Sequence, residues 1–397
     1  MRHALESDLD TLLASLGGYL DRTPERMRTL EPGHYTSEAF FQREVERIWK
    51  KEWINVGHVA EVRKPGDFFT VELLGEPMII VRGKDMEVRT LSTVCRHRYM
   101  LVVKPGESGS TSRFQCPYHR WTYGLDGQLQ HALHMEKSID FDPNSICLPQ
   151  FRTEIWNNLV WVNLDDDAAP LAPKVEALDK AFAAYRVPKD WVMANPYDKI
   201  WPGNWKNFNE NNMEGYHHMG LHEETLETYT PTRGTTNITY GEGWTHYQTP
   251  YDLDRPTAQA LLEEVDWKSG DLGQEMPCLD IFMIHPANAF VIYPGGAGFY
   301  ALWPVGVDKL RYRAGSARPP GELRRLDPDG EPYDSYRVLD EDGKAMPFIA
   351  QGVRSAKAVP GHMSWMEEPI LRWYQWIARR MLGPADSGRE DGRLENG

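Results

Sequence analysis

The stretch Cys95-Arg96-His97, followed after eighteen intervening residues by Cys116-Pro117-Tyr118-His119, decides the fold of the first half of this chain. Each short pair offers one thiolate and one imidazole. Together they suit either a tetrahedral zinc ion or a [2Fe–2S] cluster with two Cys on one iron and two His on the other. Zinc sites usually bring their Cys in CxxC or CxxxxC pairs and their His on a helix, and neither pattern occurs here. The CxH spacing therefore favours the cluster.

The residues around the two pairs predict that loops hold the cluster. Pro105, Gly106 and Gly109 separate the pairs, and Phe114-Gln115 leads into the second pair as a short strand. The segment 121–127 that follows has the pattern of a strand end and a tight glycine turn. Four ligand-type residues at paired spacing are hard to assemble by accident, so an ordinary structural role for all four is a poor alternative.

A second group of candidate metal ligands lies further along the chain. His217 and His222 are five residues apart, so they would not stack on one helix face as an i, i+4 pair does. They could converge if the helix ends near Gly220 and His222 approaches from the following turn. Two His and one carboxylate form the facial triad that binds Fe(II) and leaves positions open for dioxygen and substrate. An isolated pattern of this kind is more often structural, but here it follows a cluster motif.

From about Phe40 to Gln375 the chain resembles the Rieske non-haem iron oxygenases. The Cys/His pairs carry the resemblance, together with Asn204-Trp205-Lys206 and the stretch 210–222. It implies a Rieske [2Fe–2S] cluster on Cys95, His97, Cys116 and His119, and a mononuclear Fe(II) on His217 and His222. It also implies that the chain is the terminal oxygenase component, or α subunit, of a multicomponent system.

In this family a carboxylate three residues before the first iron-binding His joins the two metal centres. The resemblance implies that Glu214 bridges His119 of one subunit and His217 of its neighbour. A carboxylate that accepts from a ligand His fixes its tautomer and raises its basicity. The family commonly forms head-to-tail homotrimers, sometimes with a β subunit, so the same assembly is expected here.

The third iron ligand is the point where the resemblance is weakest. The family supplies an Asp, often preceded by Glu, at the start of a C-terminal helix that contains a Gln. The stretch 366–375 ends in Gln375 but has no Asp. Because Pro369 suits the first position of a helix, Glu368 is expected to take the place of that Asp. Glu367 remains the alternative.

Bulk properties limit the possible partners. With 397 residues the chain is long enough for two domains, and its net charge of −14 with no basic run argues against nucleic-acid binding. The chain has no apolar stretch of membrane-spanning length and no secretory pattern, so a cytoplasmic protein is expected. No phosphate-cradling glycine loop is visible, so electrons from NAD(P)H must arrive through a reductase or ferredoxin.

The expected fold class is α+β. We expect an N-terminal helical segment at 1–48 that packs on the catalytic domain, a small antiparallel β Rieske domain at 49–165, a helix-grip-like catalytic domain at 170–382, and a disordered tail at 383–397. In the catalytic domain the pattern predicts helices near 174–185 and 369–381, and strands near 238–240, 279–284, 289–293 and 299–305.

Three functions fit these features. The first is hydroxylation of a small aromatic substrate, as in aromatic hydrocarbon catabolism, with a lining from Trp244, Phe282, Ile284, Phe290 and Trp303. Ordinary core packing is the commoner role of such residues. The second is N- or O-demethylation, for example of a quaternary ammonium compound that Tyr and Trp side chains could surround. The third is electron transfer without oxygenase chemistry, which the missing Asp keeps open.

Overall fold

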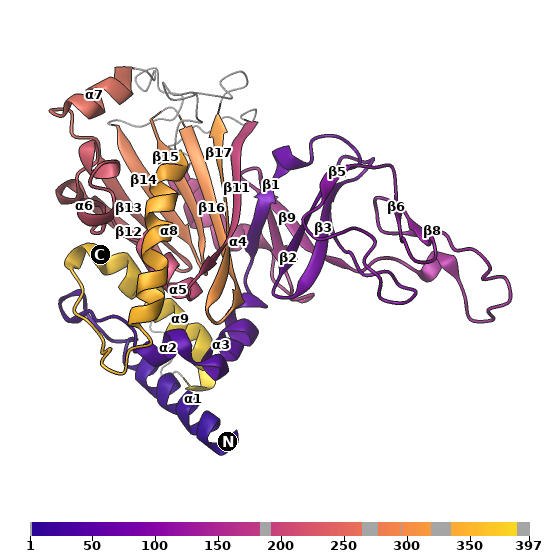
Figure 1. The fold of residues 1–397 in the computed structure, drawn as a ribbon, viewed down its shortest axis with the longest axis horizontal. Helices are drawn as coiled ribbons and strands as arrows, with labels where there is room; N and C mark the ends of the chain where they lie inside the picture. The colour runs from indigo at the N-terminus through magenta and orange to yellow at the C-terminus, as the bar shows by residue number, and fades with distance from the viewer. Residues whose placement is uncertain (1, 183–191, 264–276, 295, 319–334, 387–397) are drawn as a thin grey trace. The chain divides into compact units, whose positions relative to one another are not determined.

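The computed structural model describes residues 2–182, 192–263, 277–294, 296–318 and 335–386. The chain forms two compact units, one from residues 51–172 and the other from residues 1–50 together with the chain from residue 173 onward. Each unit is built on an antiparallel sheet (Figure 1). The predicted α+β class is therefore confirmed.

The unit at 51–172 contains a seven-stranded sheet in the order β1-β10-β9-β4-β3-β2-β5. Every neighbouring pair of strands is antiparallel. The strands are β1 (Ile54–His58), β2 (Asp67–Leu73), β3 (Glu76–Arg82), β4 (Val88–Ser92), β5 (Ser108–Ser110), β9 (Gln150–Trp156) and β10 (Leu159–Asn163).

Two tight turns set the register of this sheet. Leu74-Gly75 joins β2 to β3, and Asn157-Asn158 joins β9 to β10. All four residues have positive φ, between 49° and 84°. Two-residue hairpins need this backbone conformation because its twist matches that of the strands, and Gly and Asn adopt it at the least cost.

A second, three-stranded sheet carries the loop of the second Cys/His pair, whereas the loop of the first pair follows β4 of the seven-stranded sheet. The strands of the three-stranded sheet are β6 (Phe114–Gln115), β7 (Thr122–Tyr123) and β8 (Leu129–His131). Tyr123, Phe114 and Trp121 pack with both Cys95 and Cys116 in one buried cluster. The cluster motif thus lies where the short strands meet a hydrophobic core.

The other unit is built on a seven-stranded sheet in the order β11-β17-β16-β15-β14-β13-β12. The strands are β11 (Val192–Pro202), β12 (Thr236–Gly241), β13 (Trp244–Pro250), β14 (Cys278–Ile284), β15 (Asn288–Tyr293), β16 (Gly296–Gly306) and β17 (Lys309–Arg318). The four strands predicted from the sequence fall within β12, β14, β15 and β16, whereas β11, β13 and β17 were not predicted.

Figure 1 shows the helices of this unit. They are α1 (Arg2–Gly17), α2 (Pro32–Thr36), α3 (Glu38–Glu44), α4 (Leu171–Phe182), which begins in the other unit, α5 (Trp205–Asn212), α6 (His218–Leu221), α7 (Pro256–Glu263), α8 (Ser335–Gly352) and α9 (Glu368–Asp386). Helix α5 contacts β16, α8 contacts β11, and α9 contacts β12 and β13. The predicted helices near 174–185 and 369–381 correspond to α4 and α9, whereas α8 was not predicted.

A buried ion pair ties the N-terminal segment to α5. Nζ of Lys206 lies 2.7 Å from Oε1 of Glu44, and both side chains are fully buried. Trp205 Nε1 donates to the other oxygen of Glu44 at 3.0 Å. Removal of one partner would leave an uncompensated buried charge, which typically destabilises a fold by about 3–5 kcal/mol. The pair therefore fixes α3 against the helix that precedes the candidate iron ligands.

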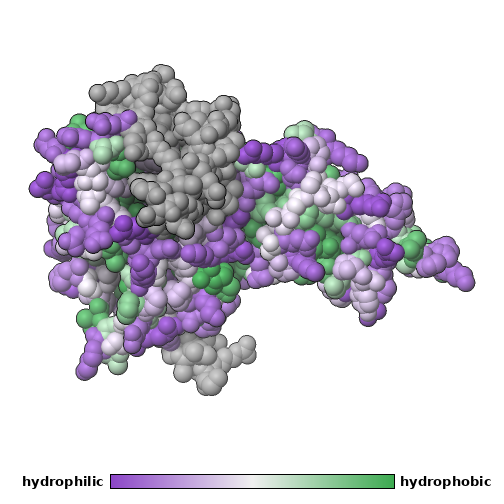
Figure 2. Space-filling view, turned by 45° about the horizontal axis from the view of Figure 1, so that its top comes forward, coloured by the Kyte–Doolittle hydropathy of each residue, from purple (hydrophilic) through white to green (hydrophobic). Residues whose placement is uncertain are grey.

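None of the helices in the described ranges is both long and apolar enough to cross a membrane. The face shown in Figure 2 is largely hydrophilic, with scattered apolar patches. The tail predicted to be disordered begins at residue 383, but α9 continues to Asp386, and residues 387–397 lie outside the described part of the chain.

Candidate metal centres

The two Cys/His loops have the same backbone geometry. In the first loop the amide of Cys95 donates to Met100 O at 2.9 Å, and that of Tyr99 donates to Cys95 O at 3.2 Å. In the second loop the amide of Cys116 donates to Trp121 O at 2.8 Å, and that of Arg120 donates to Cys116 O at 3.0 Å. Tyr99 and Arg120 close these turns with φ of 61° and 59°. Each loop therefore buries its Cys and carries its His at the turn.

The four side chains of these loops fit a metal cluster. Cys95 and Cys116 are 1% and 2% exposed. The His97 and His119 rings lie 4.5 Å apart, and Trp121 stacks on His97 with ring planes 7° apart. Both histidine Nδ1 atoms are buried, and neither has a hydrogen-bond partner among the described residues. A buried nitrogen left without a partner is costly, and a metal ion would satisfy it.

A tyrosine hydroxyl lies against one of the two thiols. Tyr123 Oη is 3.2 Å from Cys95 Sγ, and the same oxygen accepts from the amide of Arg96 at 3.1 Å. Burial raises the pKa of Tyr123, so its hydroxyl stays protonated and can donate to a thiolate. Hydrogen bonds to cluster sulfurs are one of the factors that set a cluster's potential.

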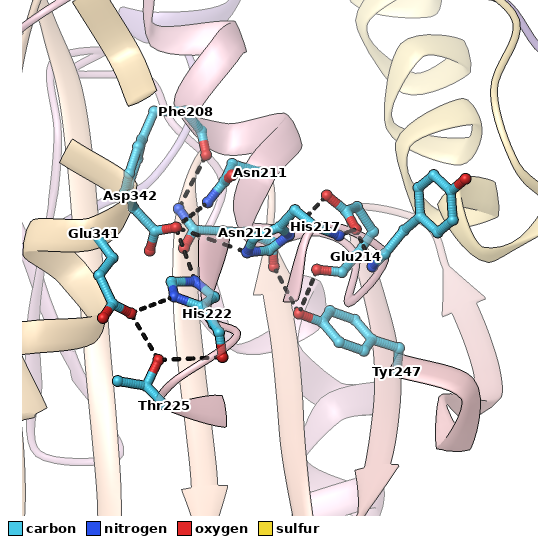
Figure 3. Close-up of polar contacts among 11 residues, drawn as sticks. Phe208, Asn211, Asn212, Glu214, His217, His222, Thr225, Tyr247, Glu341 and Asp342 are labelled. Atoms are coloured by element: carbon cyan, nitrogen blue, oxygen red, sulfur yellow. Dashed lines mark hydrogen bonds and ion pairs between the residues drawn. The ribbon is translucent and has the colours of Figure 1, made fainter. Parts of the chain in front are cut away.

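The second group forms around a very short helix (Figure 3). Helix α5 begins after Asn204, whose side chain accepts from the amide of Lys206 at 3.0 Å. After α5 ends, His217 caps the N-terminus of α6 and His222 caps its C-terminus. Their ring centroids lie 5.0 Å apart. A helix of four residues thus brings together two His that a longer helix would have separated.

Asp342 of α8 completes this group. Ligand atoms of His217, His222 and Asp342 all lie within 4.8 Å of one another. Oδ1 of Asp342 is 3.0 Å from Nε2 of His222 and 3.7 Å from Nε2 of His217. Nε2 of His222 is buried and makes no hydrogen bond of good geometry within the described residues. Two imidazole nitrogens and one carboxylate oxygen that converge in this way fit an Fe(II) facial triad.

The structure places the two predicted carboxylates away from this group. Glu368 accepts from Nε of Arg372, four residues later on α9, at 3.1 Å. Glu367 accepts from the amide of Ser364 and caps the short 3₁₀ helix that precedes α9. Both acids are held by contacts that a helix start provides, and neither joins the group formed by His217, His222 and Asp342.

The sequence does contain a signal for Asp342. Glu341-Asp342 followed by Gln351 has the pattern that the family places on its C-terminal helix, an Asp preceded by an acid and followed by a Gln. Gly343 and Pro347 lie inside α8 and obscure its helical pattern. In α9 a Gln also follows two acids, and this competing pattern favoured that helix in the sequence.

A carboxylate holds each of the two His through Nδ1. Oε1 of Glu214 lies 2.8 Å from Nδ1 of His217, and Oε2 of Glu341 lies 2.8 Å from Nδ1 of His222. Asn211 Nδ2 donates to Asp342 Oδ1 at 2.9 Å. Burial alone would lower the pKa of His217, but the charge of Glu214 outweighs it and raises that pKa. Sequence analysis identified Glu214 but not Glu341 or Asn211.

The predicted aromatic lining lies on the wrong face of the sheet. Tyr247 of β13 faces the metal group, because its hydroxyl donates to Glu214 O at 3.1 Å. Residues directly opposite in an antiparallel pair share a face, and successive residues alternate. The five residues with the opposite orientation, assigned by this alternation and the strand register, are Trp244, Phe282, Ile284, Phe290 and Trp303.

Tyrosines occupy the face toward the metal group instead. Tyr300 pairs with Ala289 and Tyr312 with Leu302, which puts both on the same face as Tyr247. Burial raises the pKa of all three hydroxyls, and the charge of Asp342 raises them further. Tyr312 Oη is buried and has no hydrogen-bond partner among the described residues. This face therefore carries buried tyrosines whose hydroxyls stay neutral near a carboxylate.

Sequence and structure comparisons show to which proteins the chain is similar. Residues 52–152 match the Rieske [2Fe-2S] domain, and residues 182–383 match the ring hydroxylating alpha subunit (catalytic domain). The carnitine monooxygenase oxygenase subunit of Escherichia coli (strain K12) is 32% identical over 225 residues, which cover 55% of this chain and 60% of that protein. The 2-aminobenzenesulfonate 2,3-dioxygenase subunit alpha of an Alcaligenes species is 30% identical over 256 residues, 62% of this chain and 61% of that one.

The fold also matches solved structures. That of a quaternary ammonium Rieske monooxygenase has a TM-score of 0.78 at 24% identity and covers 90% of this chain and 96% of the other. The chain spans about three fifths of the length of the carnitine monooxygenase subunit it matches in sequence. The catalytic-domain match extends over more than half of the residues of this chain and follows a Rieske domain. The chain therefore belongs to the ring-hydroxylating alpha-subunit family of Rieske oxygenases.

Proposed function

We propose that this chain is the terminal oxygenase of a multicomponent Rieske system that hydroxylates a quaternary ammonium compound next to its nitrogen. The observation that carries the proposal is the convergence of His217, His222 and Asp342 in a chain that also contains a Rieske domain. An electron-transfer protein would need only the Rieske domain. With Asp342 in the group, the reason to favour electron transfer without oxygenase chemistry falls away.

The residues have separate tasks in this proposal. Cys95, Cys116, His97 and His119 would hold the cluster, and His217, His222 and Asp342 would hold Fe(II). When bound, the two centres supply single electrons and a place where dioxygen is activated beside the substrate. The chain itself orients the ligands: Glu214 and Glu341 fix the tautomers of His217 and His222, so that each Nε2 is left with a lone pair.

The substrate class is proposed from the tyrosine face. Tyr247 and Tyr300 bring aromatic rings, which attract a cation through their quadrupoles, to the face toward the metal group, and the buried Asp342 adds negative charge. The ring of Tyr312 packs on Trp201 and Phe208 instead. A quaternary ammonium group carries its charge without an N–H donor, so it needs this kind of surface rather than a hydrogen-bond acceptor. The relatives that act on carnitine support the same class.

A small aromatic substrate is the second candidate. It is favoured by the similarity to the 2-aminobenzenesulfonate dioxygenase subunit, which matches a comparable part of the chain. The lining first expected for such a substrate points to the opposite face of the sheet, and this weakens the case. O-demethylation stays within the same chemistry and is covered by the same assay.

We further propose that electrons come from a separate reductase or ferredoxin, and that copies of the chain form a head-to-tail ring, as a homotrimer with or without a β subunit. Two observations support an interface at the cluster loops. Tyr99 and Tyr118 are 85% and 53% exposed beside His97 and His119. Exposed large aromatic side chains at this density are typical of protein interfaces. In such a ring the cluster of one subunit would lie beside Glu214 of the next.

Oxygen uptake tests the proposal. The purified chain, with its cluster and iron loaded, is supplied with NADH and a surrogate reductase, and then with carnitine, glycine betaine or choline. Hydroxylation replaces a C–H bond beside the nitrogen by C–OH, and the resulting hydroxylated ammonium ion loses a proton and splits its C–N bond, so each product pair is a tertiary amine and a carbonyl compound. Substrate-dependent uptake with matched amine release supports the proposal. Uptake only with 2-aminobenzenesulfonate or naphthalene would replace it by the aromatic candidate, and an Asp342→Ala chain serves as the inactive control.

A further inference from the structure

The imidazole of His222 is held between two consecutive residues of α8. Oδ1 of Asp342 lies 3.0 Å from its Nε2, and Oε2 of Glu341 lies 2.8 Å from its Nδ1. Successive residues on a helix project in different directions, so two adjacent acids can reach opposite sides of one ring. His222 is 1% exposed, and solvent therefore cannot replace either contact.

Glu341 belongs to a chain of charges that leads to the surface. The hydroxyl of Thr225 donates to the same Oε2 at 2.6 Å. Arg337, one turn earlier on α8, has Nε 3.3 Å from Oε1 of Glu341, and its Nη2 lies 2.9 Å from Glu224. The exposed fractions of the side chains rise from 14% at Glu341 to 49% at Arg337 and 83% at Glu224. The inner acid is thus anchored on several sides, whereas the outer pair lies in solvent.

Asp340 shows that this arrangement is specific to one position on α8. Its carboxylate turns away from the metal group, toward Tyr197 Oη at 3.3 Å and Lys199 Nζ at 3.2 Å. Three consecutive acids on one helix therefore make three different sets of contacts, and two of them hold opposite sides of the His222 ring. Only the third faces the convergence of Nε2 atoms, and only the second reaches an Nδ1 atom.

We propose that Glu341 is the positioning residue of the second iron ligand. It accepts the Nδ1 proton of His222, keeps the lone pair on Nε2 directed at Asp342, and makes the imidazole a stronger donor to a metal. Glu214 does the same for His217, so each His of the triad has its own carboxylate. The inference rests on the proposed function, because it assumes that the triad binds a divalent metal.

Metal affinity tests this without recourse to turnover. Glu341→Gln keeps the size of the side chain but removes the charge, and we expect its affinity for Co²⁺ to fall by about tenfold or more, in the range of outer carboxylates of metal sites. Co²⁺ is titrated into the full chain with its cluster intact and followed through d–d absorption and equilibrium dialysis. Asp340→Asn is the matched control, and its Co²⁺ affinity should equal the parent's.

The controls separate failure of this inference from failure of the proposed function. If the parent and His222→Ala bind Co²⁺ equally, the triad is not a metal site and the proposed function fails. If the parent binds Co²⁺ and Glu341→Gln binds it with the same affinity and spectrum, the positioning role is overturned. Should Glu341→Gln not fold, Thr225→Val removes one donor to the same oxygen, and a loss of about threefold is then expected. An unchanged affinity in that variant would equally overturn the role.

Discussion

Nε2 of His222 lies 3.0 Å from Oδ1 of Asp342, although one residue follows α6 and the other is part of α8. The nitrogen makes no hydrogen bond of good geometry within the described residues, and the oxygen is held by Asn211. Because this contact lacks hydrogen-bond geometry, the two buried groups are arranged as two ligands of one ion rather than as a donor and its acceptor. The first prediction follows from this relationship.

Asp342→Ala should lose the mononuclear iron and keep the Rieske cluster. Removal of one of three protein ligands leaves too few to hold Fe(II), so iron should fall from about three to about two atoms per chain. Iron analysis alongside the visible absorbance of the cluster checks this. Glu368→Gln, which disturbs only the contact with Arg372, should keep about three irons. The reverse outcome would restore Glu368 as the ligand.

How much the sequence predicts differs between the two metal groups. The ligands of the cluster lie in two short loops, each closed by its own hydrogen bonds, so local spacing is enough to identify them. The iron group depends on two distant segments. Its third member lies on a helix that contains Gly343 and Pro347, and neither residue is typical of a helix interior. Tertiary packing of α8 stabilises what local propensity does not predict.

The sequence could not predict which side chains of the sheet face the metal group, and the reason is different. Every residue of β14 is buried, so the strand has no alternation of apolar and polar residues that would distinguish its two sides. Phe282 and Ile281 are both large apolar residues, yet their side chains lie on opposite faces of the sheet. Only the pairing of Ile281 with Tyr247, whose hydroxyl reaches Glu214, shows which of them is on the side of the metal group.

Tyr123→Phe should lower the reduction potential of the cluster. Reduction adds negative charge to the sulfurs, so a donor at 3.2 Å from Cys95 stabilises the reduced form more than the oxidised form. A difference of about 1 kcal/mol between the two states corresponds to about 40 mV for a single electron. Protein-film voltammetry measures it. Tyr118→Phe alters an exposed tyrosine beside His119 and should leave the potential unchanged; an equal shift in both variants would contradict the role of Tyr123.

Glu210→Gln should remove a pH-dependent loss of stability. Burial raises the pKa of Glu210 to about 7, although Tyr35 and Tyr374 donate to its Oε1 at 2.7 and 2.9 Å. In the unfolded chain the pKa returns to its ordinary value of 4.5. Between these values the folded state holds one more proton, so stability falls as pH rises, by at most about 3 kcal/mol. Gln cannot ionise, and the variant should lack this fall.

Thermal unfolding at pH 5 and pH 8 measures the effect. The free energy of unfolding of the variant minus that of the parent should be larger at pH 8 than at pH 5. Burial lowers the pKa of His34 and of His58 to about 4. Through these two groups the folded state loses stability as pH falls from 6.5 toward 4. That contribution has the opposite sign and is present in both proteins, so it cancels in the difference. Parallel pH profiles would show that Glu210 ionises normally in the folded state.

Electron transfer between subunits gives the last prediction. Loaded with excess Fe(II) to offset a weaker hold of His217 on the metal, Glu214→Gln should keep both metal centres and the oligomer, but coupled turnover should fall by about tenfold or more without the charge that orients the imidazole. Glu223→Gln, an exposed acid of the same loop, is the control.

Mixed oligomers locate the effect. A chain without cluster, Cys116→Ser, and a chain without iron, His222→Ala, should regain activity when coexpressed, since one subunit's cluster serves its neighbour's iron. Glu214 is bonded to His217 of its own chain. Adding Glu214→Gln to the Cys116→Ser chain should therefore abolish the regained activity, whereas adding it to the His222→Ala chain should have no effect. No regained activity in the mixture, or equal loss from both placements, would show that electrons do not pass between subunits through Glu214.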